Sequence, residues 1–256
     1  MYFGLSEDQE FFKDNVSKFL QDHAPLDVIK KIIEDDEHDL KNNIKNGLVN
    51  LGINSLLIPE EYGGLGLDLL FATAVSQSLG ENIAPFSFLS CYVMTPIALI
   101  NGGSAEQKEK YLKGILENKY KFGVGFSEFI SARNDFGFIF KDNKINGKSI
   151  FILDADDVSH LLLADENGVI GVVDTNDKNI EIIKLTTVDK TRSYSEVIFK
   201  NASIDVLENS ITDIEPIKKS IDAGRIILAA DSLGASEALI RKAVQYSKER
   251  KQFGRA

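Results

Sequence analysis

The chain has few residues of several types that would otherwise decide its class. It contains one cysteine, Cys91, among 256 residues, which excludes a disulfide framework or a thiolate metal cluster and favours a reducing compartment. Its 29 Lys and Arg residues are outnumbered by 39 Asp and Glu residues, giving a formal net charge of -10. Phosphate binding along a nucleic acid needs a basic face, which this composition does not supply overall. Any anion site must therefore be local.

Targeting and membrane signals are also missing. The segment from Met1 to Glu7 carries no basic residue ahead of an apolar run, and no uncharged apolar stretch approaches ~18 residues. The composition, 43% apolar and 27% charged, is that of a globular protein. We therefore expect a soluble cytoplasmic protein with no membrane insertion.

Motifs for several other chemistries do not occur. His23, His38 and His160 are widely spaced, which favours exposed or structural histidines over metal ligands. There is no G-x-S-x-G nucleophile elbow and no G-x-x-x-x-G-K-[ST] phosphate loop. The acidic runs at 34–37 and 154–157 lack the Gly and distal Glu of an EF-hand loop and are interpreted as solvated faces or turns. The sequence predicts no metal site.

Helical patterns fill the first 120 residues. Ser6 to Gln9 has the form of a capping box, followed by apolar residues at helical spacing, and predicts an amphipathic helix to about His23. A second box, Ser104 to Gln107, predicts a helix through Leu116. The segments 70–79 and 92–100 show the same period.

The pattern changes to β at Lys121 and back to helix at Ile214. Short apolar runs separated by Asp, Asn and Gly turns predict strands at 122–126, 136–140, 149–153, 161–163, 169–173, 180–183 and 197–199. Small residues in the final helical stretch indicate close helix packing. The prediction is an α+β multidomain fold with an N-terminal all-α domain (1–120), a middle antiparallel β sandwich or barrel (121–206) and the start of a C-terminal helical bundle (207–256).

Four motifs carry a family resemblance. They are I-P-E-E-Y-G-G-L-G at 58–66, G-S-A-E-Q-K-E-K-Y-L at 103–112, Asn146-Gly147 with Phe151-Ile152 after it, and Y-S-K-E-R-K-Q-F-G-R at 246–255. In this order they resemble segments of the acyl-CoA dehydrogenase flavoproteins. Each motif is weak alone, but together they span the chain. The resemblance implies FAD as cofactor, desaturation of an acyl-CoA thioester with hydride transfer to flavin N5, an electron-transfer flavoprotein as acceptor, and a homo- or heterotetramer.

The resemblance also assigns roles to individual positions. Arg250 matches an arginine that reaches the FAD pyrophosphate of a neighbouring subunit, a role suited to guanidinium; the alternative is a solvated basic helix end. Asp222 and Arg225 match a pair beside the bound thioester, or form a simple helix-surface ion pair. A core role remains the alternative for Phe151 and Leu153. The candidate cofactor-binding residues are Phe126, Ser127, Phe151, Ile152, Arg250, Gln252 and Phe253, and the candidate substrate-binding residues are Asp222 and Arg225.

The chain departs from the family pattern in several places. Ser127 to Asn134 replaces T-E-P-x-x-G-S-D and keeps the acid as Glu128, while Leu153 replaces a Thr or Ser that bonds the flavin. Gly224 stands where some members carry the catalytic glutamate, so we expect the base beyond Ala256, or absent, and the fragment to be inactive. The segment 80–89 resembles a branch with steroid side-chain heterotetramers, in which one subunit type is degenerate. The hypotheses are an acyl-CoA dehydrogenase lacking its C-terminal third, a noncatalytic partner subunit, or a flavin oxygenase on the same fold; the acyl group is not identified.

Overall fold

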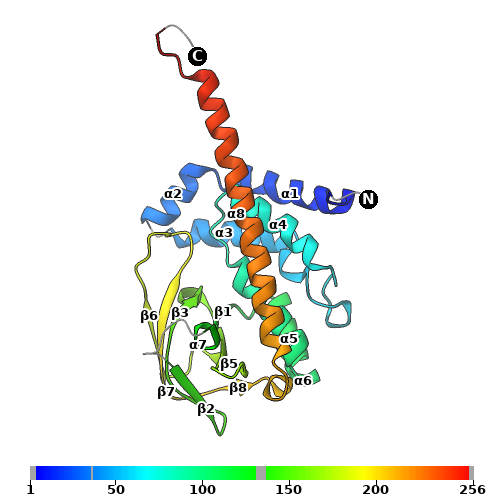
Figure 1. The fold of residues 1–256 in the computed structure, drawn as a ribbon, viewed down its shortest axis with the longest axis vertical. Helices are drawn as coiled ribbons and strands as arrows, with labels where there is room; N and C mark the ends of the chain where they lie inside the picture. Colours follow the sequence, from blue (N-terminus) through cyan, green and yellow to red (C-terminus); the bar gives the residue numbers. More distant parts are fainter. Residues whose placement is uncertain (1–3, 36, 131–136, 254–256) are drawn as a thin grey trace. The chain divides into compact units, whose positions relative to one another are not determined.

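The computed structural model describes residues 4–35, 37–130 and 137–253, and the chain folds into two compact units (Figure 1). The first unit comprises Met1–Ile53, Leu70–Phe86 and Ile226–Ala256, and the second comprises Asn54–Leu69 and Ser87–Arg225. The three-domain division expected from the sequence stays a prediction.

The first unit is helical. Its capping box closes as predicted, since the Gln9 amide donates to Ser6 Oγ at 3.3 Å and the Ser6 amide donates to Gln9 Oε1 at 2.9 Å. The helix that it begins ends at His23, as the sequence predicts. The helices are α1 (Glu7–His23), α2 (Leu26–Asp35), α3 (His38–Asn50), α4 (Leu69–Glu81) and the part of α8 (Glu215–Glu249) that follows Arg225.

Close packing between α4 and α8 confirms the expectation from the small residues. Ser76 Oγ donates to the Ile227 carbonyl at 2.8 Å. A Cβ placed on Gly234 would lie 1.9 Å from the Gln77 carbonyl oxygen. The two helix backbones therefore approach so closely that they leave no room for a side chain at this position.

The second unit combines helices with a sheet. A π-helical segment (Phe88–Met94) runs into α5 (Thr95–Gly102), and the second predicted capping box begins α6 (Ala105–Leu116). Short 3-10 helices cover Ile53–Ser55, Glu60–Tyr62, Ala155–Asp157 and Glu208–Ile211. The strands are β1 (Phe122–Gly125), β2 (Gly137–Lys141), β3 (Lys144–Leu153), β4 (His160–Ala164), β5 (Ile170–Asp174), β6 (Ile180–Lys184), β7 (Tyr194–Ser203) and β8 (Asp205–Val206).

The strands form one sheet in the order β6-β7-β3-β1-β4-β5-β8, with β2 also paired to β3. Its core is a cluster of buried apolar side chains that includes Ile145, Ile152, Leu161, Val197 and Phe199. Every predicted run overlaps an observed strand, but Phe126 and Val169 lie just outside β1 and β5, and Phe136 is outside the described residues.

Two details differ from the sequence expectation. The sheet is mixed, because β1 pairs with β4 in parallel while the other pairings among the described residues are antiparallel. The long excursion through β2 and β3 gives the chain enough length to return parallel to β1. The predicted flavin-facing segment also leaves the strand at Ser127, where α7 (Ser127–Ile130) begins and the Ile130 amide donates to the Phe126 carbonyl. Residues 131–134 of the predicted motif lie outside the described residues.

Candidate functional site

A bulge in β3 brings Phe151 to the surface. Ser149 pairs with Val197 and Ile152 pairs with Ser195, so Ile150 and Phe151 together oppose the single residue Glu196. Phe151 has a φ of 59°, a backbone conformation that is costly for a bulky side chain. Its ring is 47% exposed. The chain thus adopts a strained geometry that leaves a large aromatic face open to solvent.

A partly buried polar cluster, formed by Ser127, Glu128 and Ser149, lies at the same bulge. Ser127 Oγ is 2.7 Å from the Ile150 carbonyl oxygen and 3.0 Å from Glu128 Oε2. Ser149 Oγ is 3.1 Å from the same Glu128 oxygen. The other carboxyl oxygen, Oε1, is buried and has no hydrogen-bond partner within the described part of the chain. Burial raises the pKa of Glu128, and the hydrogen bonds it receives offset only part of the rise.

Two predicted cofactor residues lie beside this bulge with their side chains inside. Phe126 is 4% exposed and Ile152 is fully buried in the sheet core. These residues can therefore meet a ligand through backbone groups only. The Ser127 hydroxyl is already engaged by the Ile150 carbonyl and by Glu128.

The predicted substrate pair lies on α8 within the second unit. Arg225 Nη1 is 2.9 Å from Asp222 Oδ1, and both side chains are more than half exposed. Gly224, one residue before Arg225, faces the Met94 side chain, and a Cβ there would lie 2.9 Å from the Met94 sulfur. A side chain at 224 would need the flexible Met94 side chain to shift.

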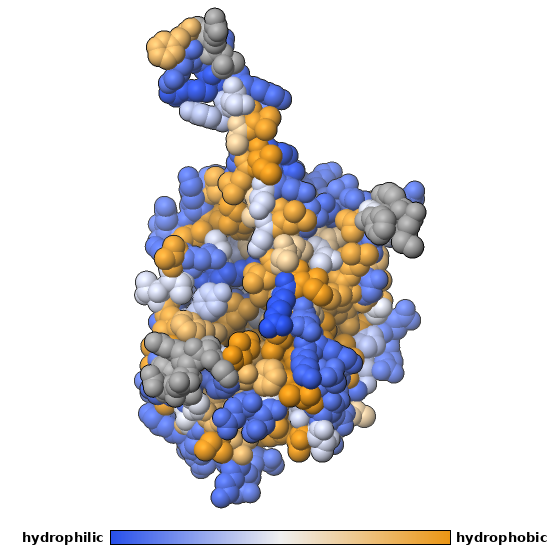
Figure 2. All heavy atoms as spheres, viewed as in Figure 1, coloured by the Kyte–Doolittle hydropathy of each residue, from blue (hydrophilic) through white to orange (hydrophobic). Residues whose placement is uncertain are grey.

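The remaining predicted cofactor residues lie in the first unit, at and beyond the end of α8. Arg250, Gln252 and Phe253 are exposed. The Arg250 amide donates to the Tyr246 carbonyl at 2.8 Å, and its guanidinium carbon lies 6.0 Å from the Tyr246 ring centroid. Apolar side chains are also exposed along this part of α8, as Figure 2 shows, among them Leu239 and Ile240. The structure thus places the candidate residues in two groups, one in each unit.

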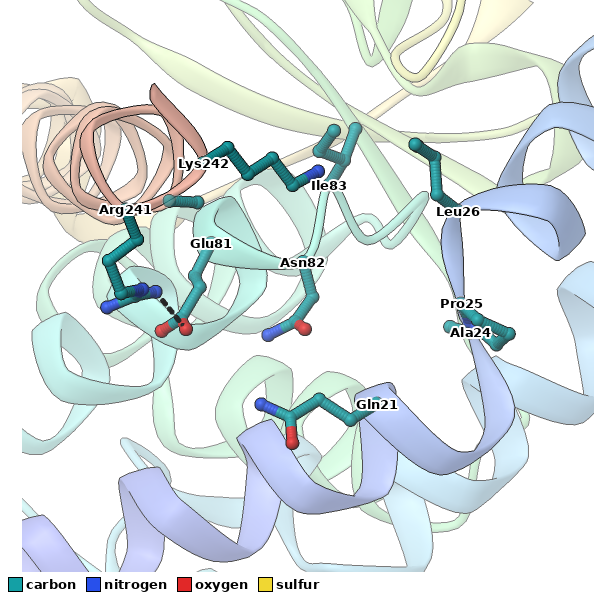
Figure 3. Close-up of a pocket in the computed structure, with 10 residues that line it drawn as sticks. Gln21, Ala24, Pro25, Leu26, Glu81, Asn82, Ile83, Arg241 and Lys242 are labelled. Carbon is teal, nitrogen blue, oxygen red and sulfur yellow. Dashed lines mark hydrogen bonds and ion pairs between the residues drawn. The ribbon is translucent and has the colours of Figure 1, made fainter. Parts of the chain in front are cut away.

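The first unit also holds a groove of about 340 Å³ that the sequence did not predict. Figure 3 shows Arg241 joined to Glu81 by an ion pair, with the Lys242 ammonium extending toward Ile83. Its walls come from the turn after α1, the end of α4 and α8. No local motif marks such a groove, because its residues are far apart in the sequence.

Among the described residues, no helix combines the length and apolarity needed to cross a membrane. The described residues also contain no group of three or more His, Cys, Asp or Glu side chains that could hold a metal ion.

The chain belongs to the acyl-CoA dehydrogenase family. Residues 6–119 match the family's N-terminal domain model, and residues 214–256 match its C-terminal domain model. The chain is 28% identical over 278 residues to a short-chain-specific acyl-CoA dehydrogenase of Clostridium acetobutylicum, covering 100% of this chain and 72% of that protein. It is 25% identical over 251 residues to acyl-CoA dehydrogenase IpdE2 of Mycolicibacterium smegmatis, covering 98% of this chain and 68% of that protein. It is 25% identical to the mitochondrial isovaleryl-CoA dehydrogenase of Pongo abelii, of which it spans 64%.

Solved structures share the fold. Butyryl-CoA dehydrogenase from Megasphaera elsdenii has a TM-score of 0.82 at 22% identity, covering 100% of this chain and 72% of that one. A structure of PigA with FAD and proline has a TM-score of 0.85 at 19% identity, with the same coverage. The helical, mixed-sheet and helical order of this chain is thus the acyl-CoA dehydrogenase fold. The relatives indicate an oxidoreductase of the FAD-dependent, acyl-CoA class.

Proposed function

We propose that this chain is part of an FAD-dependent acyl-CoA dehydrogenase that desaturates an acyl-CoA thioester between its α and β carbons. The observation that carries the proposal is the exposed Phe151 ring, held at a strained bulge at the position matched to a flavin-facing aromatic of the family. Strained geometry persists only where surrounding structure enforces it, and such strain concentrates at functional sites. When bound, FAD supplies the hydride acceptor.

The residues at the bulge fit a planar aromatic ligand. Phe151 offers an exposed ring face for stacking. The backbone around Phe126 and Ile152 is held by their buried side chains, which provides a rigid edge against which a ring system can be oriented. The resulting role for this chain is to position the cofactor and exclude water from one side of it.

Substrate and phosphate contacts come from exposed charged groups in the proposal. Asp222 and Arg225 would contact the thioester and its pantetheine arm, and their high exposure leaves them free to exchange their mutual ion pair for a ligand. Arg250 would bind the pyrophosphate of a neighbouring subunit's FAD together with Gln252 and Phe253. Its guanidinium makes no ion pair within the described part of the chain, and its fork suits a diphosphate.

Specific features favour the alternative, a degenerate partner subunit that binds little flavin. Leu153 has no hydrogen-bond donor where the resemblance expects Thr or Ser. The Ser127 hydroxyl is engaged inside the protein, and Gly224 carries no proton acceptor. In this version the chain completes an oligomer and lends Arg250 to the cofactor of a catalytic neighbour.

Partners follow from the proposed function. We propose a tetramer, either homomeric or heteromeric, in the cytoplasm, with an electron-transfer flavoprotein as acceptor. The printed name of one relative, the caffeyl-CoA reductase-Etf complex subunit CarC of Acetobacterium woodii, supports this choice of acceptor. The single buried cysteine is compatible with a reducing compartment.

One titration separates the two versions. The purified protein is mixed with FAD, and binding is followed by flavin absorbance and fluorescence. The dehydrogenase version expects a flavin complex from this chain alone, and weaker binding by Arg250→Ala with unchanged thermal stability. The partner version expects no complex until a second, catalytic homologue is added. Reduction of the bound flavin by butyryl-CoA or isovaleryl-CoA under anaerobic conditions, in whichever assembly binds FAD, then tests the reaction.

A further inference from the structure

One arrangement of protons accounts for the three hydrogen-bond contacts of the partly buried polar cluster at the bulge. The Ile150 carbonyl can only accept, so the 2.7 Å contact uses the single proton of Ser127. The 3.0 Å contact between Ser127 Oγ and Glu128 Oε2 then needs a proton from the carboxyl group. Ser149 donates to the same carboxyl oxygen at 3.1 Å. The result is a continuous chain of donors from Ser149 through Glu128 and Ser127 to Ile150.

The surroundings agree with a neutral carboxyl. An ionised Glu128 would leave Oε1 buried and charged without a hydrogen bond, which is costly. The side chains that face it are the Ser127 hydroxyl from α7 and the Ser149 hydroxyl from β3. No charged side chain pairs with Glu128 among the described residues. Burial also raises the pKa of this carboxyl.

Both ends of this hydrogen-bond chain lie on β3 at the bulge. It begins at Ser149, just before the extra residue, and ends at the carbonyl of Ile150, which precedes Phe151. Bulges leave backbone groups outside the ladder, and Ser127 satisfies the Ile150 carbonyl here. Removal of the Glu128 carboxyl group would break its hydrogen bonds to both Ser127 and Ser149. The strained backbone at Phe151 would then lose the interactions that hold it in place.

We propose that Glu128, as a neutral acid, is a positioning residue that locks the β3 bulge and thereby holds the Phe151 ring outward for the cofactor. The effect on cofactor binding rests on the proposed function, whereas the role of Glu128 in holding the bulge does not. The proposal adds a role for a residue that is not itself among the candidate cofactor-binding or substrate-binding residues. It predicts that a neutral isostere keeps the lock and that truncation breaks it.

The sequence provides a clean reporter for the test, because it contains no tryptophan. Phe151→Trp places a single indole at the bulge, and its emission maximum, anisotropy and acrylamide quenching are measured without FAD. Added to this background, Glu128→Ala is expected to lower the anisotropy and change the quenching, while Glu128→Gln leaves both at the reporter's own values. Ser149→Ala should shift them in the same direction as Glu128→Ala, and it serves as the second variant if Glu128→Ala does not fold.

The matched control is Glu196→Gln, since Glu196 is the residue opposite the bulge and forms a 3.9 Å ion pair with Lys148. It should leave the indole signals unchanged. Unchanged indole signals in both Glu128→Ala and Ser149→Ala overturn the lock. Equal changes in Glu128→Gln and Glu128→Ala overturn the neutral-acid assignment.

A second readout uses FAD with Phe151 intact. Glu128→Ala is expected to weaken FAD binding roughly tenfold, which corresponds to about 1.4 kcal/mol, while Glu128→Gln and Glu196→Gln bind like the wild type. If the wild type binds no FAD, the proposed function fails, but the indole measurements still decide the lock. If the wild type binds FAD and Glu128→Ala binds equally well, the positioning role is wrong and the proposed function stands.

Discussion

Replacing Gly234 by alanine tests the close contact between α4 and α8. The added Cβ would lie 1.9 Å from the Gln77 carbonyl oxygen and 2.9 Å from the Glu81 amide nitrogen. Both are backbone atoms of α4, so no side chain can rotate away to make room. The helices would have to separate by roughly 1.5 Å before the methyl group reached an ordinary contact distance.

Two opposing terms set the size of the effect. Alanine favours a helix over glycine by about 1 kcal/mol, which alone would stabilise the protein. Overpacking costs about 1–3 kcal/mol, and the upper end applies because the clash is with backbone. The separation would also strain the Ser76 bond to the Ile227 carbonyl, 2.8 Å long. We therefore expect Gly234→Ala to lower the free energy of unfolding by about 2 kcal/mol.

Urea unfolding followed by far-UV circular dichroism measures this change. Ser232→Ala is the control, because Ser232 is exposed on the same helix and the substitution tests helix propensity without the clash. Gly80→Ala meets the Asp231 carbonyl oxygen at 2.0 Å, and combined with Gly234→Ala it should cost less than the sum, since both open the same interface. If Gly234→Ala unfolds at the same or higher urea concentration than the wild type, the contact is not as close as described.

Three further outcomes are expected. Asp222→Ala and Arg225→Ala should each change the unfolding free energy by less than about 0.5 kcal/mol, because their pair is exposed; a thermal melt checks this, and a large loss would mean a structural role. Tyr111→Phe should cost about 1–2 kcal/mol, because it removes the 2.6 Å bond to Asp205; chemical unfolding tests this, and a neutral result would contradict it. Because the folded-state pKa of Glu128 is raised, stability should fall as pH rises from its ordinary pKa through the raised one, and Glu128→Gln should remove that slope in melts across pH.

Local patterns were enough for much of the fold. Each capping box at Ser6 and Ser104 uses only residues within one turn, and both form as predicted. The strands could be predicted because short apolar segments bounded by turn residues are typical of β-strands. The close packing of the last helix was also predicted from a local pattern, since many small residues on a helix favour close approach, but the pattern did not single out Gly234.

The direction of a strand and the start of a short helix depended on the tertiary structure. The apolar residues of β1 and β4 are compatible with either direction, and the parallel pairing is set by how the chain returns after β3. The helix at Ser127 forms where β1 ends and Ser127 can reach the Ile150 carbonyl of another strand. Neither partner is near the other in the sequence.

Residue patterns were sufficient to identify the family, the order of the helical and β segments, and the positions that match a flavoprotein. The folded chain was needed to show that Phe151 lies on a bulge with φ of 59°, and that Glu128 lies partly buried between two serines. The physical reason is that register, burial and proton sharing arise between segments more than 20 residues apart in the chain, such as Glu128 and Ser149. Residue types can suggest an acid and an aromatic ring, but only the folded chain places the acid between two hydroxyl groups and leaves the ring exposed.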